Sequence, residues 1–205
     1  MTDHPVVTAW RELELTLQKM IPDVHQNLEV GACDSDFSAV EHLIAFKLPS
    51  DFREFYKRHN GHLAIEDIEY GFSGTDYFLF ALIFFPLYLP DRARDETEDL
   101  ELWDASVFDI IDRGMDHMTE FLDEVEIDDA IKPVGWNPKW IPIACTPEED
   151  YVCVDYDPSP EGTLGQVIFC RYTESRIQLI ASSLAEFLEI QTEDLKNGST
   201  VADPQ

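Results

Sequence analysis

The chain has 205 residues, and its 42 acidic against 14 basic side chains give a formal net charge of −28 at pH 7. This charge excludes a protein that coats nucleic acid by neutralising phosphates, because such proteins need clustered Lys and Arg. It also excludes attachment to anionic membrane surfaces. The content of 44% hydrophobic and 12% aromatic residues is typical of a folded chain, and at this length one domain can bury a sizeable core.

The N-terminus and the cysteines favour a cytoplasmic protein. Residues 1–20 lack a basic segment followed by an apolar run, so we expect no secretory signal. The longest apolar run, residues 78–89, contains Pro86 and is too short to span a bilayer. The four cysteines contain no CxxC pair, and we expect them to be reduced. Three of them lie in strand-like segments as small hydrophobic residues, namely Cys145, Cys153 and Cys170.

Two helices are predicted before residue 47. An apolar stripe at spacings of three and four predicts a helix from about Thr8 to Met20, and Pro22 ends it. Ser38 and Glu41 stand three residues apart, as a capping box requires. They predict a short second helix that begins near residue 38.

The stretch from Leu48 to Gly61 predicts a third helix. Ser50 is a suitable N-cap, and Gly61 can adopt the left-handed conformation that ends a helix. His59 and His62 form the best pair of candidate metal ligands in the chain. No further ligand lies near them in sequence, however, so the pattern favours a structural role in a cap and turn.

The next part of the chain changes from apolar to strongly acidic. Short aromatic and aliphatic runs between Leu63 and Leu89, broken by Gly and Pro, predict two or three strands. Residues 91–130 then hold 16 acids and three bases, a local net charge of −13. Apolar residues keep a helical spacing here on both sides of Gly114, so we interpret the segment as an insertion of two amphipathic helices with acidic outer faces. The carboxylates near these faces are Asp104, Asp109, Asp112, Asp116, Glu120 and Asp123.

Three strands are predicted between residues 140 and 172. They are Trp140–Cys145, Tyr151–Tyr156 and Gly165–Tyr172. Short links rich in turn residues predict that they pair as an antiparallel meander. Trp140 could stack on a ligand, but a core anchor at the start of a buried strand is the favoured interpretation.

A final helix should begin near Ser182 or Ser183. Its expected buried face is Leu184, Phe187, Leu188 and Leu195, and residues 198–205 should be frayed. The absence of repeats and linkers indicates a single α+β domain over residues 1–197. We expect a mostly antiparallel (mixed) sheet flanked by helices.

The sequence offers no catalytic motif. It contains no phosphate-binding loop and no nucleophile elbow, and Ser182 and Ser183 are better explained as helix caps than as nucleophiles. We therefore expect no catalytic residue, cofactor or metal. One group of carboxylates lies where strands end and leaves three alternatives open: a catalytic or Ca²⁺ site, a surface that faces a partner, or plain solvation. These residues are Glu148, Glu149, Asp150, Asp155 and Asp157.

Two stretches together resemble a known family. LPSDFREFYKRHNG, followed in order by WIPIA, a strand ending in Asp155, GQVI and IASSLAEFLE, is similar to the SUKH superfamily, the Smi/Knr-like group. The resemblance extends from the first helix to about Glu189, apart from residues 91–130. The family's motif positions map onto Leu48, Pro49, Phe52, Tyr56, Asn60, Gly61, Trp140, Pro142, Asp155, Gly165 and Gln166.

The resemblance implies an α+β fold without known catalytic activity. Bacterial members of the superfamily are commonly immunity proteins that bind and neutralise a cognate toxin, and fungal members act as regulatory scaffolds. Nuclease toxins are often basic, and an acidic protein can compete for their phosphate-binding surface and associate quickly with it.

We therefore expect a non-enzymatic immunity protein that binds a basic toxin domain, without nucleic acid or membrane as partners. The acidic helices and the strand-end carboxylates are its expected binding surface. Two alternatives remain: a regulator or scaffold that binds endogenous proteins, and a carboxylate-based hydrolase.

Overall fold

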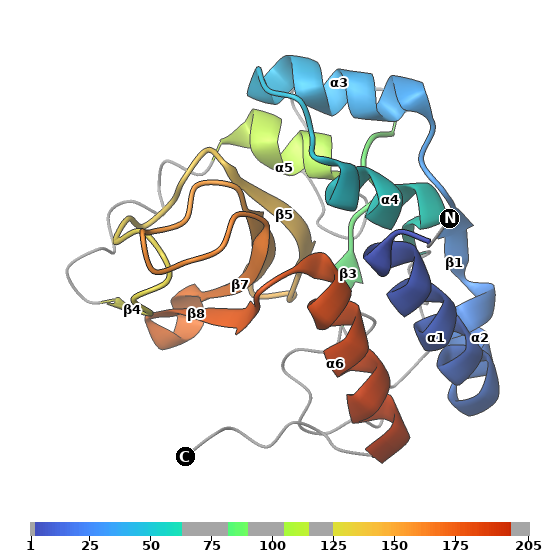
Figure 1. Cartoon of the computed structure of the whole chain (residues 1–205). Coiled ribbons are helices and arrows are strands. Elements are labelled where there is room, and N and C mark those ends of the chain that lie inside the picture. The colour runs from blue at the N-terminus through green and yellow to red at the C-terminus, as the bar shows by residue number, and fades with distance from the viewer. Residues whose placement is uncertain (1–2, 63–81, 90–104, 115–124, 198–205) are drawn as a thin grey trace.

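The computed structural model describes residues 3–62, 82–89, 105–114 and 125–197 (Figure 1). Its α-helices are α1 (Pro5–Met20), α2 (Pro22–Gln26), α3 (Asp34–Ile44), α4 (Ser50–Arg58), α5 (Val107–Arg113) and α6 (Leu184–Asn197). Its strands are β1 (Leu28–Val30), β2 (His59–His62), β3 (Ile83–Phe84), β4 (Glu126–Ile127), β5 (Trp140–Cys145), β6 (Tyr151–Asp155), β7 (Gln166–Arg171) and β8 (Arg176–Ala181). A short 3₁₀ helix, η4 (Tyr172–Glu174), joins β7 to β8.

The main sheet is mixed and mostly antiparallel. Its six strands have the order β3-β5-β6-β7-β8-β4. Only the short β4 runs parallel to its neighbour β8, and the other pairs are antiparallel. A separate two-stranded sheet joins β1 to β2. Together with the surrounding helices (Figure 1), this arrangement confirms the predicted α+β fold.

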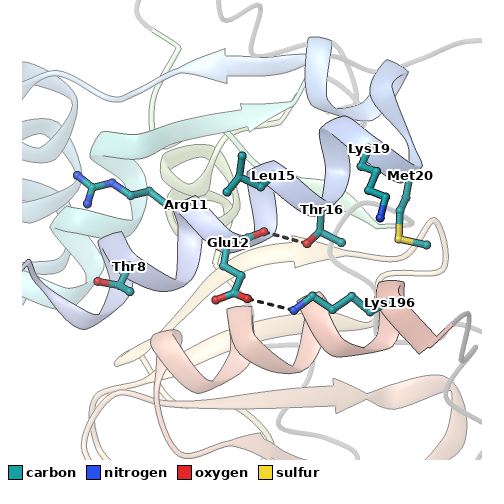
Figure 2. A pocket seen from close by; sticks show the side chains of 8 residues that line it. All are labelled: Thr8, Arg11, Glu12, Leu15, Thr16, Lys19, Met20 and Lys196. Atoms are coloured by element: carbon teal, nitrogen blue, oxygen red, sulfur yellow. Dashed lines mark hydrogen bonds and ion pairs between the residues drawn. The ribbon is translucent and has the colours of Figure 1, made fainter.

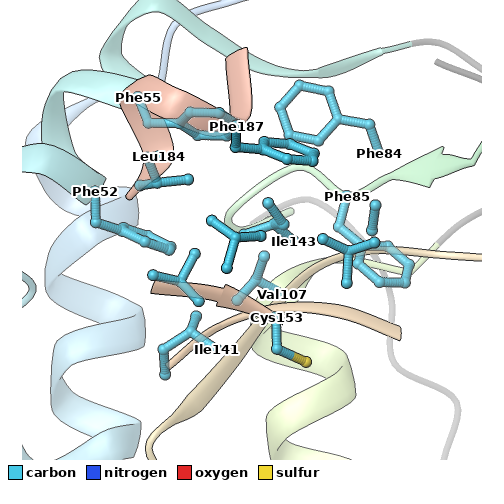
Figure 3. Packing of buried hydrophobic residues seen from close by; sticks show 14 of the residues in the cluster. Phe52, Phe55, Phe84, Phe85, Val107, Ile141, Ile143, Cys153, Leu184 and Phe187 are labelled. Carbon is cyan, nitrogen blue, oxygen red and sulfur yellow. The ribbon is translucent and has the colours of Figure 1, made fainter. Parts of the chain in front are cut away.

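The three central strands are the predicted meander. Every residue of β5, β6 and β7 is buried, as expected for strands covered on both faces. The thiols of Cys145, Cys153 and Cys170 lie within these strands, as predicted, and burial raises the pKa of Cys145 and Cys153. Figure 3 shows aromatic and aliphatic side chains from several elements meeting in the core, among them Phe52, Phe55, Phe187, Ile141 and Ile143.

The first and last helices pack against each other, and their predicted apolar faces are buried except at Met20, which is 45% exposed. α1 starts three residues earlier than predicted because Pro5 occupies the first turn and Nδ1 of His4 accepts a hydrogen bond from the Val6 N–H at 3.4 Å. The inner face predicted for α6 is buried, and the Ser183 hydroxyl accepts a hydrogen bond from the Glu186 N–H at 3.2 Å. Ser183 therefore caps α6 as predicted.

The predicted start of the second helix is wrong. α3 begins at Asp34, and Cys33 is its N-cap, with the Asp36 carboxylate accepting the Cys33 N–H at 2.8 Å. Ser38 lies one turn inside the helix. Glu41 is buried and accepts hydrogen bonds from the Leu48 N–H at 3.0 Å and from Arg53 at 2.9 Å. Glu41 thus ties α3 to α4 and takes no part in a cap.

The boundaries of α4 also differ from the prediction. Ser50, the predicted N-cap, is instead the first helical residue. The N-cap position is occupied by Pro49, which makes no side-chain hydrogen bond. The helix ends at Arg58, and Gly61 lies within β2 at φ +89°. A Cβ on Gly61 would stand 2.7 Å from the Pro86 nitrogen, so glycine permits close approach of two backbones here and does not end the helix.

The acidic segment is described only in part. α5 matches the first predicted helix over residues 107–113, and it packs against α3 and β5. The second predicted helix lies outside the described residues, as do Asp104, Asp116, Glu120 and Asp123. The predicted tail and most of the strands predicted between Leu63 and Leu89 also lie outside them. In the described part of the chain, no helix is both long and apolar enough to cross a membrane.

Candidate protein-binding surface

Asp155 belongs to the interior and not to a binding surface, which corrects the expectation for this residue. It is fully buried at the end of β6, and burial raises the pKa of its carboxyl. The carboxylate accepts hydrogen bonds from Gln166 Nε2 at 2.9 Å and from the Asp157 N–H at 2.8 Å. Gln166 Nε2 also donates to the Ala130 carbonyl at 2.9 Å. These motif residues therefore fix the loop before β5 to the end of the meander.

Asp157 is half-buried and holds neighbouring loops together. Its carboxylate pairs with Lys132 at 2.5 Å and accepts a hydrogen bond from Asn137 at 3.1 Å. These two hydrogen bonds lower the pKa of Asp157. Its charge is therefore compensated within the fold.

Asp150 is also buried, with only 5% of its surface exposed. Its carboxylate accepts hydrogen bonds from the backbone N–H of Thr173, at 3.0 Å, and from the Thr173 hydroxyl. It thereby ties the β5–β6 turn to η4. The expectation that Asp150 faces a partner is corrected for the same reason as for Asp155.

Asp109 caps α5. Its carboxylate accepts the Ser106 N–H at 2.9 Å, and its own N–H donates to the Ser106 hydroxyl at 3.2 Å, which completes a capping box. The side chain is buried. Helical spacing had indicated an acidic outer face here, but the cap turns Asp109 inward.

Among the described residues, three of the predicted carboxylates lie on adjoining elements and are at least partly exposed. Asp112 and Glu148 are exposed, and Glu149 is half-buried. The structure connects α5 to the β5–β6 turn through Arg113, whose guanidinium lies 3.7 Å from the Glu149 carboxylate. Tyr151 donates a hydrogen bond from its hydroxyl to Glu149 at 3.2 Å. We call Asp112, Glu148 and Glu149 the acidic surface.

Sequence reasoning did not assign a role to Arg113. It is the only Lys or Arg between Asp104 and Ala130, and this isolation was the signal available in the sequence. In the structure it provides the ion pair that joins the two halves of the acidic surface.

The pair Asp150 and Asp155, at opposite ends of β6, does not fit a glycosidase arrangement. Asp150 precedes β6 and Asp155 ends it, so five residues, or about 17 Å of extended chain, separate them. Glycosidase carboxylates are typically about 5–9.5 Å apart. The neighbouring Trp140 is 1% exposed and pairs with Asp155 across the strands, as predicted for a core anchor.

The two histidines of the 59–62 stretch are held by the fold. Nε2 of His59 lies 2.8 Å from the Glu14 carboxylate, and Nδ1 lies 3.2 Å from the Glu29 carbonyl. Nε2 of His62 lies 3.0 Å from the Leu82 carbonyl. Within the described residues, no group of three His, Cys, Asp or Glu side chains is arranged to hold a metal ion.

Comparison with known proteins gives a consistent family. The sequence pattern of the SMI1 / KNR4 family (SUKH-1) matches residues 31–190. The chain is 27% identical over 97% of its length to the cell wall biosynthesis/cell cycle regulator smi1 of Schizosaccharomyces pombe. It is 24% identical over 93% of its length to the cell wall assembly regulator SMI1 of Saccharomyces cerevisiae.

A shorter match involves a different type of protein. Over 29% of its length, the chain is 43% identical to F-box only protein 3 of Mus musculus, of which the match covers 13%. The two fungal regulators are also longer than this chain, which spans 38% and 40% of their lengths.

Proposed function

The chain belongs to the SMI1 / KNR4 family (SUKH-1), and from that premise we propose that it is a non-enzymatic regulatory domain that acts by binding a protein partner. The fungal relatives, similar to the chain over nearly all of its length, are named as regulators of cell wall biosynthesis or assembly. This supports the regulator alternative over the immunity protein expected from the sequence.

The observation that carries the binding proposal is that some of the predicted carboxylates are buried and others are exposed. Asp109, Asp150 and Asp155 are buried and bonded within the fold. The acidic surface differs in exposure: Asp112 and Glu148 are exposed and Glu149 is half-buried, on two adjoining elements. A partner with Lys or Arg side chains would be attracted there by the local and the overall charge.

Neutralising the acidic surface tests this proposal. The variant Asp112→Asn/Glu148→Gln/Glu149→Gln removes three negative charges with little change in shape. The matched control Asp23→Asn/Asp129→Asn/Glu189→Gln removes the same number of charges from exposed positions elsewhere. Each tagged protein is used to capture partners from the source cells, and recovered proteins are quantified.

We expect the first variant to lose at least one partner that the wild type and the control both retain. Equal recovery by both variants would contradict the assignment of the binding face. Melting curves of all three proteins separate loss of binding from loss of folding.

The net charge favours a second candidate, an immunity protein that neutralises a basic toxin domain. A chain with three acids for each base suits a partner whose own surface must attract phosphates. The neighbouring gene distinguishes the candidates. A large secreted protein with a toxin-like C-terminus encoded beside this chain would favour immunity, and its absence would favour the regulator.

A further inference from the structure

A groove of about 450 Å³ lies between α1 and α6 (Figure 2), and its lining includes no residue of the acidic surface. Figure 1 shows both helices apart from α5, which carries Asp112. The side chains that matter most in its lining are Arg11, Glu12, Leu15, Lys19, Met20 and Lys196. All except Lys196 come from α1, and Figure 2 shows Glu12 reaching across to Lys196.

The charge of this lining is the reverse of that of the whole chain. Three of its side chains are cationic and one is acidic, whereas acids outnumber bases three to one in the sequence. Arg11 pairs with Asp3, and Lys196 pairs with Glu193 at 3.0 Å and with Glu12 at 3.1 Å. All these side chains are at least 39% exposed, so the ion pairs contribute little to stability and can exchange partners at small cost. Lys19 has no ion-pair partner among the described residues.

The groove also presents apolar side chains that the fold leaves uncovered. Leu15 is 68% exposed and Met20 is 45% exposed, although the neighbouring Leu13 and Leu17 are fully buried. Leu15 therefore lies on the outer face of α1. Arg11 and Lys19 lie four residues before and after Leu15. The three side chains therefore form one row along the helix, with a cation on each side of the leucine.

We propose that this groove docks an acidic amphipathic helix of a partner protein. From Arg11 to Lys19 the row extends about 12 Å along α1, enough for about two turns of a second helix. The occupant places a leucine-sized side chain against Leu15 and Met20, and carboxylates one turn to either side against Arg11 and Lys19. Outside this lining the chain carries a net charge of −30, which slows the approach of an acidic partner. Screening over about 8 Å at physiological ionic strength limits this repulsion, whereas the contacts with Arg11 and Lys19 act at shorter range.

The probe for this proposal is a synthetic alanine-based helical peptide with Glu, Leu and Glu at positions i, i+4 and i+8. A second peptide carries Lys in place of both Glu residues. Binding to the full chain is followed by two-dimensional NMR of the ¹⁵N-labelled protein. We expect the Glu peptide to shift amide signals in residues 8–20 and 190–197, and the Lys peptide to leave them unchanged.

Variants at exposed positions identify the contacts. Leu15→Asp and Lys19→Glu should each weaken binding of the Glu peptide at least tenfold. The matched controls Leu164→Asp and Lys139→Glu make the same changes at exposed positions outside the groove lining, and they should bind like the wild type. Well-dispersed spectra of all four variants show that each is folded.

Three outcomes would overturn the proposal. They are equal shifts with the Lys peptide, equal weakening by the control variants, and shifts confined to residues outside α1 and α6. Self-association through the groove, seen as a dimer in sedimentation that Leu15→Asp abolishes, would assign the site to a second copy instead. The variant Asp112→Asn/Glu148→Gln/Glu149→Gln should bind the Glu peptide normally, so failure here is distinguishable from failure of the acidic surface.

Discussion

Glu14 shows how a single residue connects the first helix to the rest of the molecule. Its carboxylate forms an ion pair with Arg58 and lies 2.8 Å from Nε2 of His59. Glu14 therefore joins α1 to the end of α4 and the start of β2. Burial raises the pKa of Glu14. The hydrogen bonds and charges of Arg58 and His59 outweigh this effect and lower the pKa from 4.5 to about 2.

Replacing Glu14 should therefore destabilise the protein in a pH-dependent way. A carboxyl group whose pKa is lower in the folded state contributes stability that is fully present above pH 4.5 and is lost as the pH falls toward 2. We expect Glu14→Gln to lower the free energy of unfolding by roughly 1–3 kcal/mol at pH 7, and the difference from wild type to shrink below pH 4.5.

Urea unfolding at pH 7, 4 and 3 measures this difference. Glu12→Gln is the matched control because Glu12 is exposed on the same helix and pairs with Lys196, so its loss should cost under about 0.5 kcal/mol. Equal effects of the two substitutions at pH 7 would show that Glu14 does not stabilise the fold in this way.

At the scale of elements, the elements predicted correctly are those with a clear local pattern of apolar residues. The meander β5–β7 and helix α6 matched because continuous apolar runs and a helical stripe decide burial without long-range information. The start of α3 could not be predicted, because the role of Glu41 depends on Leu48 and Arg53 of the following segment. A short-range capping rule assigned it to the wrong partner.

Strand β8 was missed for a different reason. The chain turns into it through η4 and Ser175, which adopts a left-handed conformation at φ +53° without a glycine. Its burial is also partial, so neither a continuous apolar run nor a Gly or Pro boundary marked it. Prediction of the candidate site was limited in a similar way. The sequence shows where carboxylates are clustered, but it does not show which of them are buried in the fold.

Helix α5 offers a direct test of that distinction, because Asp109 and Asp112 lie on the same short element. Asp109 is buried and accepts the Ser106 N–H, so Asp109→Ala leaves that buried donor unpaired and should cost about 1–3 kcal/mol of stability. Asp112 is exposed on the acidic surface. We expect Asp112→Ala to change stability by under about 0.5 kcal/mol and to weaken binding of a captured cationic partner.

Thermal unfolding and equilibrium binding of both variants check this prediction. At a temperature where the Asp109→Ala protein remains folded, its binding should stay near that of the wild type. A loss of binding in the Asp109 variant with none in the Asp112 variant would reverse the assignment.

On the scale of the whole molecule, charged side chains in different regions have different environments. Buried carboxylates cap a helix or hold loops together, and three cationic side chains line the α1–α6 groove. The carboxylates of the acidic surface are exposed or half-buried. Under the proposed function, we expect the net charge of −28 to speed the approach of a cationic partner, most strongly at low ionic strength, and the acidic surface to determine where that partner binds.

The association rate of the captured partner as a function of ionic strength tests this claim most directly. For wild type we expect the rate to fall at least about tenfold as salt rises from roughly 10 to 500 mM. The variant Asp112→Asn/Glu148→Gln/Glu149→Gln should show a shallower dependence than its charge-matched control Asp23→Asn/Asp129→Asn/Glu189→Gln. A rate independent of salt, or identical dependences for the two variants, would contradict binding through the acidic surface.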